Sequence, residues 1–132
     1  IGSPAMNFIE GVISGTDELQ FQSLDSSLII KLPNVYKTKL EKYNNKNIYL
    51  GIRPEDISNT PYNSDKELNN NSFVLEVVEP MGNEIFLYFN AANNQFVARI
   101  PSMEKPKVGS SIDLYFNTSK LHFFDKETEK AL

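Results

Sequence analysis

The chain has 132 residues, 40% hydrophobic and 11% aromatic, which is enough apolar material for the core of one domain. It contains no cysteine, so disulfide scaffolds, thiolate zinc sites and cysteine nucleophiles are excluded, and nothing requires an oxidising compartment. With 17 acidic and 13 basic residues the formal net charge is -4, which disfavours nucleic acid as a partner, because phosphate binding relies on lysine and arginine.

Short segments of alternating apolar and polar residues follow one another along the chain, separated by turn residues. This pattern predicts an all-β barrel or sandwich with about nine short strands and little helix. The predicted strands cover Asn7 to Ser14, Glu18 to Gln22, Ser27 to Leu32, Asn47 to Arg53, Ser72 to Glu79, Glu84 to Asn90, Gln95 to Ile100, Ser111 to Phe116 and Lys120 to Phe124.

Alternation also predicts which side chains form the core. In the fourth strand Ile48, Leu50 and Ile52 share one face, as a period of two requires. Because several strands carry such stripes, we expect a closed or nearly closed sheet around one interior. The other stripes are Ile85, Leu87 and Phe89, then Phe96, Ala98 and Ile100, and finally Ile112 and Leu114.

One short helix is predicted between the third and fourth strands. Asn34 can cap it, and Tyr36, Leu40 and Tyr43 recur at helical spacing. A barrel with one helix at an open end is the outline of an oligonucleotide/oligosaccharide-binding (OB) fold, which we predict here, although the pattern alone does not separate a barrel from a sandwich.

Residues Ser58 to Asn71 form a polar, asparagine-rich segment without periodicity. A loop of this length is either functional or loosely ordered. We interpret it as a mobile surface connection.

A buried strand runs into a proline-locked turn between Leu50 and Asp56. Pro54 lacks an N–H and pushes Arg53 towards extended geometry, so the strand must stop or reach a sheet edge here. Arg53 and Glu55 then emerge side by side. They either form an ion pair that holds the turn or contact another subunit, and the ion pair is the favoured interpretation.

A second turn lies between Val78 and Glu84. Pro80 and Gly82 would interrupt a long strand there, and Gly82 gives the backbone freedom for a tight reversal. Met81 either packs in the core or offers an adaptable contact to a partner, and the core is favoured.

Catalysis finds little support in the sequence. His122 is the only histidine, and no cysteine joins it in a metal site, so we interpret it as a filler of its apolar segment. There is no glycine-flanked serine nucleophile and no phosphate-binding loop of the G-x-x-x-x-G-K-[ST] type. We predict that this chain is not an enzyme and does not hydrolyse ATP by itself.

Four segments carry a resemblance to a known family: Ile1 to Phe8, Leu50 to Asp56, Val78 to Glu84 and Leu121 to Asp125. Together they resemble the C-terminal regulatory region of the ATP-binding subunits of sugar-importing ABC transporters. That family powers maltose, multiple-sugar and glycerol-3-phosphate uptake in bacteria. The segments occur in the family's order with comparable spacing. The resemblance implies one OB-like barrel of the TOBE or MOP-like type over residues 1–132, without its ATP-binding domain.

The resemblance implies a regulatory and dimerisation role. In the family, the regulatory domains of two ATPase subunits pack together while the ATP-binding domains open and close. Each renewed contact between the two ATP-binding domains is then an intramolecular event. The implied partners are a second copy of the subunit, the membrane permease subunits and, in some members, a regulatory protein. The implied location is the cytoplasm, at the inner face of the cell membrane. ATP and Mg²⁺ would bind the missing domain, and we expect no cofactor or metal in these residues.

Carried over residue by residue, the family's two signature turns match seven positions, which we predict as subunit contacts or turn-forming residues. They are Arg53, Pro54, Glu55, Pro80, Met81, Gly82 and Glu84.

Two regions depart from the family pattern. The family often has glycine near the position of Glu129, so the final turn is expected to be looser or differently shaped, and the Ser58 to Asn71 connection is longer than typical.

Two other functions stay open. Related TOBE modules bind oxyanions such as molybdate, although no internal duplication is visible here. A nucleic-acid barrel, with Tyr88 and Phe96 stacking on bases, is disfavoured by the acidic composition.

Overall fold

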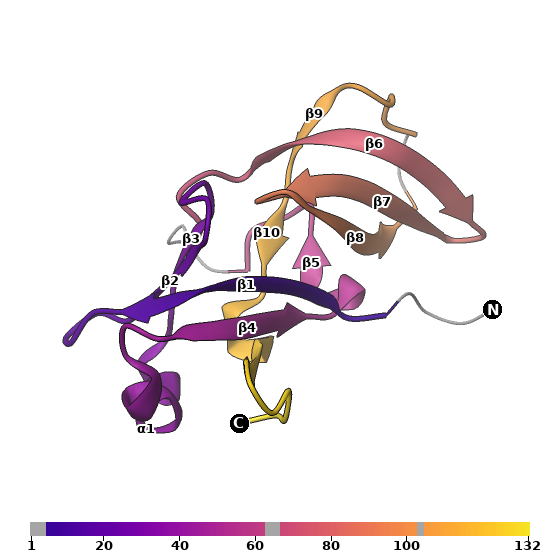
Figure 1. Cartoon of the computed structure of the whole chain (residues 1–132). Coiled ribbons are helices and arrows are strands. Elements are labelled where there is room, and N and C mark those ends of the chain that lie inside the picture. Colours follow the sequence, from indigo (N-terminus) through magenta and orange to yellow (C-terminus); the bar gives the residue numbers. More distant parts are fainter. Residues whose placement is uncertain (1–4, 63–66, 103–104) are drawn as a thin grey trace.

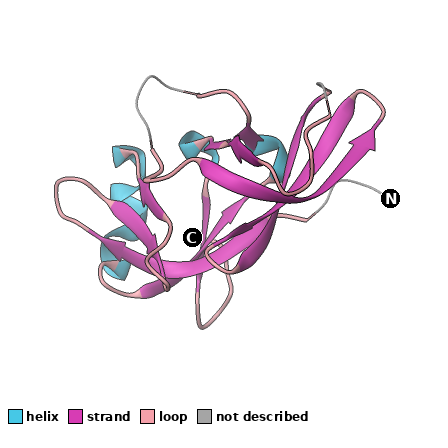
Figure 2. Ribbon diagram, turned by 90° about the horizontal axis from the view of Figure 1, so that it is seen from above, coloured by secondary structure: helices cyan, strands magenta, loops and turns pink. Residues whose placement is uncertain are grey.

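The computed structural model describes residues 5–62, 67–102 and 105–132, and these form short strands with a few helical turns (Figure 2). The all-β prediction is therefore confirmed. The strands are β1 Asn7–Ser14, β2 Gln20–Ser23, β3 Ile29–Lys31, β4 Asn47–Ile52, β5 Ile57–Ser58, β6 Ser72–Met81, β7 Glu84–Ala91, β8 Asn94–Pro101, β9 Ser111–Asp113, β10 Tyr115–Phe116 and β11 His122–Asp125. The helical turns are η1 Asn34–Tyr36, α1 Lys37–Leu40, η2 Glu41–Tyr43, η3 Pro54–Asp56 and η4 Thr118–Lys120.

Two antiparallel sheets enclose one interior. The first has five strands in the order β11-β4-β1-β2-β3, and the second has four in the order β8-β7-β6-β9. The pair β10 and β5 completes the wall between them. In Figure 1 the long strands β6, β7 and β8 lie above β1 and β4. The long β6–β7–β8 meander thus forms one layer of the barrel.

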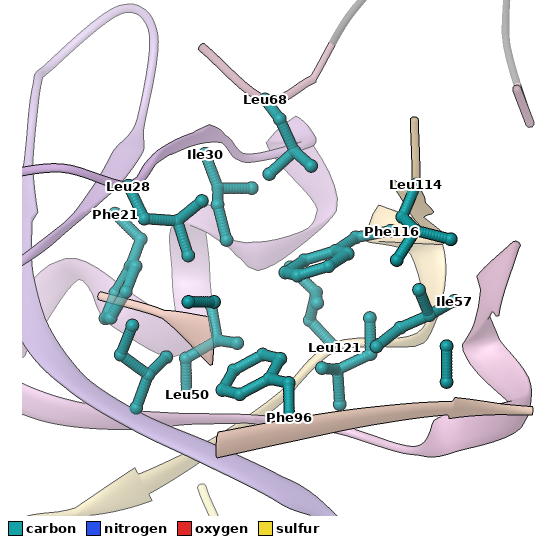
Figure 3. Packing of buried hydrophobic residues seen from close by; sticks show 14 of the residues in the cluster. Phe21, Leu28, Ile30, Leu50, Ile57, Leu68, Phe96, Leu114, Phe116 and Leu121 are labelled. Atoms are coloured by element: carbon teal, nitrogen blue, oxygen red, sulfur yellow. The ribbon is translucent and has the colours of Figure 1, made fainter. Parts of the chain in front are cut away.

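Side chains from both sheets meet in a shared core. Phe96 of β8 stacks on Phe116 of β10 with ring centroids 5.9 Å apart, and Figure 3 shows Leu50 of β4 and Phe21 of β2 at the same interior. The predicted core faces are confirmed, because all but Ile112, which is partly buried, are buried: Ile48, Leu50, Ile52, Ile85, Leu87, Phe89, Phe96, Ala98, Ile100 and Leu114.

Asn7 joins the two sheets at the start of β1. Its Nδ2 donates to the Val97 carbonyl at 3.0 Å, and the Val97 N–H donates to its Oδ1 at 2.8 Å. Since β8 is an end strand of its sheet, this side chain takes the place that a neighbouring strand would occupy. Asn7 is only 5% exposed. Without the amide, both backbone groups of Val97 would lose these partners.

The Asn7→Leu variant should unfold more easily by about 2–4 kcal/mol, because each buried polar group left without a partner costs about 1–3 kcal/mol. Urea denaturation measures this loss. Asn47→Leu is the matched control, since Asn47 is exposed on β4 and its amide donates to the Glu10 carboxylate at 3.0 Å in an exposed hydrogen bond. Equal losses for the two variants would contradict the sheet-joining role of Asn7.

The predicted helix is present over residues 34–43 but is not one α-helix. It consists of the 3₁₀ turn η1, one turn of α1 and the 3₁₀ turn η2. The predicted cap at Asn34 is wrong, because the N-cap position is Pro33 and makes no side-chain bond. In the described part of the chain, no helix is long and apolar enough to cross a membrane.

Tyr36 fastens this helical segment to the last strands. Its hydroxyl donates to the Thr118 carbonyl at 2.7 Å and accepts from the Leu121 N–H at 3.1 Å. Its ring meets Phe123 edge-on with centroids 5.1 Å apart. Burial raises the pKa of the Tyr36 hydroxyl, which therefore stays protonated and keeps donating.

The prediction of one strand from Ser111 to Phe116 is wrong. The Leu114 N–H donates to the Asn71 carbonyl at 2.8 Å, and the Asn71 amide donates back to the Leu114 carbonyl at 3.1 Å. The chain therefore passes from β9, which pairs with β6, to β10, which pairs with β5. The two-residue strand β5 was missed because it is too short to show alternation.

The predicted surface connection from Ser58 to Asn71 is wrong at Leu68 and Asn71, which are buried, whereas Asn69 and Asn70 are exposed. Leu68 is buried in the core, and the Lys31 N–H donates to the Glu67 carbonyl at 2.8 Å. This segment thus lies against the edge of β3 and helps to close the barrel. Residues 63–66, within the same prediction, lie outside the described residues.

Candidate functional site

The first signature turn has the predicted geometry at its proline. Strand β4 ends at Ile52, Arg53 is extended with φ -76° and ψ 149°, and Pro54 begins η3. The Asp56 N–H donates to the Arg53 carbonyl at 2.9 Å, which closes the turn. Pro54 is buried, so the turn presents Arg53 and Glu55 outward.

Glu55 does not pair with Arg53 as predicted. Within the described residues, its ion pair is with Arg99 of β8, whose Nη2 lies 4.0 Å from Glu55 Oε1. The Arg99 Nε lies 3.3 Å from Glu84 Oε2 at the start of β7. Arg99 therefore sits between the two signature turns and connects them electrostatically. The prediction failed because it considered only neighbours along the chain.

Carboxylates gather at this point. Burial, and then the charge of Glu55, raise the pKa of Asp56. Lys120, then His122 and Arg53, act in the opposite direction and lower the pKa of Asp56. These three groups thus offset part of the crowding of negative charge in η3.

The second signature turn is a tight hairpin between β6 and β7. Gly82 has a φ of +68°, which L side chains rarely adopt, and a Cβ there would meet nothing within 4 Å. Glycine is thus required by backbone conformation and not by crowding. The prediction that Pro80 interrupts the strand is wrong, because β6 continues through Pro80 to Met81. β9 pairs only with the first residues of β6, so at Pro80 the edge of β6 that faces away from β7 has no described partner strand. The N–H that proline lacks therefore costs no hydrogen bond between strands there.

Met81 is not a core residue, which corrects the prediction. It is 49% exposed, and it faces away from the interior because it pairs with Glu84, whereas Pro80 pairs with the buried Ile85. We call the surface on this side of the β6–β7–β8 meander the outer hairpin face. Register places three cross-strand rows on it: Val77, Tyr88 and Val97; Glu79, Phe86 and Arg99; and Met81, Glu84 and Pro101.

The outer hairpin face combines apolar and acidic side chains. Phe86 at its centre is buried, while Val77 and Met81 on β6 are exposed. Burial raises the pKa of the Tyr88 hydroxyl, and the neighbouring Glu79 carboxylate raises it further. In the described ranges, no group of three histidine, aspartate or glutamate side chains is placed to hold a metal ion. The exposed Val77 and Met81 side chains lie on this face beside the Glu79 and Glu84 carboxylates.

The structure thus brings together part of the predicted site. Glu55 and Glu84 meet through Arg99, and Pro80, Met81 and Gly82 lie at the turn of the same hairpin, where Met81 pairs with Glu84. Arg53 and Pro54 hold the neighbouring turn. Sequence reasoning missed Arg99, whose only signal was its position between the predicted core residues Ala98 and Ile100.

Arg99 and Glu84 should show a favourable coupling of up to about 1 kcal/mol in a double-mutant cycle of Arg99→Met and Glu84→Gln, as part-exposed ion pairs do. The free energy of unfolding from urea titration measures it, and high salt should reduce it. The matched cycle of Arg53→Met and Glu55→Gln should show no coupling. A larger coupling in this second cycle would contradict the assignment of the pairs.

Two family models match the chain and overlap at the first signature turn. A MalK OB fold domain model matches residues 2–57, and a TOBE domain model matches residues 50–124. The chain belongs to the TOBE domain family. The shared stretch contains the proline turn and the end of β4, and the second match includes the hairpin and Arg99.

This TOBE domain is similar to ATP-binding proteins of ABC transporters. It is 38% identical over 132 residues to the uncharacterized ABC transporter ATP-binding protein YcjV of Escherichia coli O157:H7, covering 100% of this chain and 35% of YcjV. It is 36% identical over 131 residues to the oligosaccharides import ATP-binding protein MsmX of Bacillus subtilis (strain 168), covering 98% of this chain and 35% of MsmX. The chain thus spans little more than a third of these relatives.

A solved structure with the same fold is the cytoplasmic molybdate-binding protein ModG with molybdate bound. The TM-score is 0.65 and the sequence identity 9%, and the match covers 93% of this chain and 96% of that chain. At this identity the likeness concerns the fold alone. The predicted OB-like barrel is therefore confirmed.

Proposed function

We propose that this TOBE domain is the regulatory and dimerisation domain of the ATP-binding subunit of an ABC importer for sugars or related carbohydrates. Nearly the whole chain aligns with ATP-binding proteins of ABC transporters, and MsmX among them is an oligosaccharide importer subunit by name. The domain accounts for only 35% of each relative. A domain of this kind acts on the transporter through contacts and not through chemistry of its own.

The observation that carries the proposal is the outer hairpin face. It places both signature turns beside one exposed surface, with Arg99 linking Glu55 to Glu84 and with Met81 half exposed at its end. Exposed apolar side chains framed by polar ones are characteristic of protein interaction sites. We propose that a second copy of the subunit uses this face.

Such a contact has a clear physical use in a transporter. Two ATP-binding domains separate after each cycle. If their regulatory domains stay together, the two ATP-binding domains meet again in an intramolecular event, at an effective concentration set by the length and stiffness of the linkage. The contact therefore maintains the pair without taking part in hydrolysis.

The rest of the subunit is part of the same proposal. We propose a preceding ATP-binding domain that binds ATP and Mg²⁺ and contacts membrane permease subunits at the inner face of the membrane. Reading the coding sequence upstream of Ile1 tests this directly. A phosphate-binding loop, an ABC signature motif and a switch histidine should be found, and a reading frame without them would contradict the proposal.

Self-association of the chain should be weak and should depend on Met81. Met81→Lys should weaken dimerisation by about tenfold or more, equivalent to about 1.4 kcal/mol, because it sets a charge in an apolar contact. Sedimentation velocity over a concentration series measures the dissociation constant.

Val35→Lys is the matched control, because Val35 is 76% exposed on η1, which directly precedes α1, and α1 lies far from β6 and β7 in Figure 1. It should leave dimerisation unchanged. A chain that stays monomeric at high concentration, or a dimer insensitive to Met81→Lys, would contradict the use of this face.

A further inference from the structure

A second surface of interest lies on the five-stranded sheet, on the side facing away from the core. Register aligns Phe8 of β1 with Gly51 of β4, and Tyr49 of β4 with Phe124 of β11. Phe8 is 48% exposed, although its neighbour Ile9 is fully buried in the core. The rings of Phe8 and Phe124 meet edge-on with centroids 5.3 Å apart. Three aromatic side chains therefore gather on one outward face.

Gly51 of the first signature turn makes this cluster possible. A Cβ at Gly51 would lie 2.4 Å from Met6 Sδ and 3.0 Å from Phe124 Cε2. Any other residue would push Met6 and Phe124 away, so the missing side chain leaves room for Met6 and for the Phe124 ring that meets Phe8. Beside these rings lies a depression of about 320 Å³ lined by Phe8, Tyr49, Phe124 and Glu129. We call it the aromatic depression.

The backbone at its rim is held by a hydrogen-bonded turn, from which the exposed Glu129 side chain extends. Asp125 Oδ1 accepts from the Glu127 N–H at 2.8 Å and from the Thr128 N–H at 2.9 Å, and the Glu129 N–H donates to the Asp125 carbonyl at 2.8 Å. Glu129 itself has a φ of +60°, a conformation that glycine adopts more easily. Strained backbone conformations cluster at functional sites, and Glu129 combines such a conformation with a place at the rim of a pocket.

The charge at this rim is not neutralised by the described residues. Glu10, on the same side of the sheet, has an ion pair with Lys126 at 2.6 Å, whereas no described lysine or arginine pairs with Glu129. An anionic ligand would be repelled by this carboxylate. A neutral apolar ligand would use only the rings.

We propose that the aromatic depression binds a cationic group, either an alkylammonium or a guanidinium. The negative face of an aromatic ring attracts a cation within about 6 Å of its centroid. Glu129 adds an opposite charge at the same rim, and the rings shield one side of the cation from water. Because the rims are set by sheet register and by the Asp125 turn, little ordering is needed on binding. The group would come from a free small cation or from an arginine side chain of a partner protein.

The test uses choline and its uncharged isostere 3,3-dimethylbutan-1-ol, titrated separately into the ¹⁵N-labelled chain at constant ionic strength. Amide shifts should change in a saturable way around Phe8, Tyr49, Phe124 and Glu129. Choline should bind about two- to fivefold more tightly than the alcohol, the ratio expected for an exposed cation–π contact. A capped glycine-arginine-glycine peptide in a parallel titration distinguishes the sources. Tighter binding of the peptide points to a partner's arginine, and tighter binding of choline points to a free cation.

Glu129→Gln should weaken choline binding several-fold and leave the alcohol unaffected, while Glu127→Gln in the same turn should change neither. Phe8→Leu keeps an apolar side chain but removes a ring face, so the preference for choline should fall. Equal affinity for choline and the alcohol, or no localised shift changes with any probe, would overturn the proposal. So would an unchanged choline affinity in Glu129→Gln.

Discussion

The pairing of the Asn7 side chain with the backbone of Val97 is the constraint on which the arrangement of this TOBE domain depends. It closes the outer edge of β8 against the start of β1, so the two sheets face one interior. With β8 fixed there, η3 lies beside it, and Glu55 comes within reach of Arg99. An OB-like barrel built from short strands has few long ladders between its layers, and one buried amide here connects parts of the chain 90 residues apart.

Both surfaces described above originate in the same stretch of sequence. Gly51 lets Phe8 and Phe124 meet on one side of β4, and three residues later Pro54 turns the chain so that Glu55 faces the β6–β7–β8 meander. The first signature turn therefore shapes the aromatic depression and also borders the outer hairpin face. Both surfaces include exposed apolar side chains beside carboxylates, namely Phe8 on one and Val77 and Met81 on the other, a composition suited to recognition. This agrees with a domain whose proposed task in an ABC importer is contact and control.

Much of the fold followed from local pattern, because alternation reports directly which face of a strand is buried. That held for Ile48, Leu50 and Ile52, and the extended geometry of Arg53 followed from the proline after it. The errors arose at positions where the pairing between strands decides which charges meet and which side chains are buried. The partner of Glu55 is 44 positions away, and Met81 is exposed because its register with Glu84 places it on the face opposite the core. For the same reason the role of Leu68 was not visible in a polar segment, since its burial depends on β3. The seven signature positions remain predicted subunit contacts or turn-forming residues, and oxyanion binding remains the alternative function.

Native-state hydrogen exchange measures most directly whether the Asn7 connection makes the two sheets one cooperative unit. The Val97 N–H, which donates to Asn7 at 2.8 Å, should exchange with the same opening free energy as the hydrogen-bonded amides of β4, at the level of global unfolding. Exchange of β6, β7 and β8 at a clearly lower free energy, while β1 and β4 stay protected, would show that the meander opens by itself and would contradict this account.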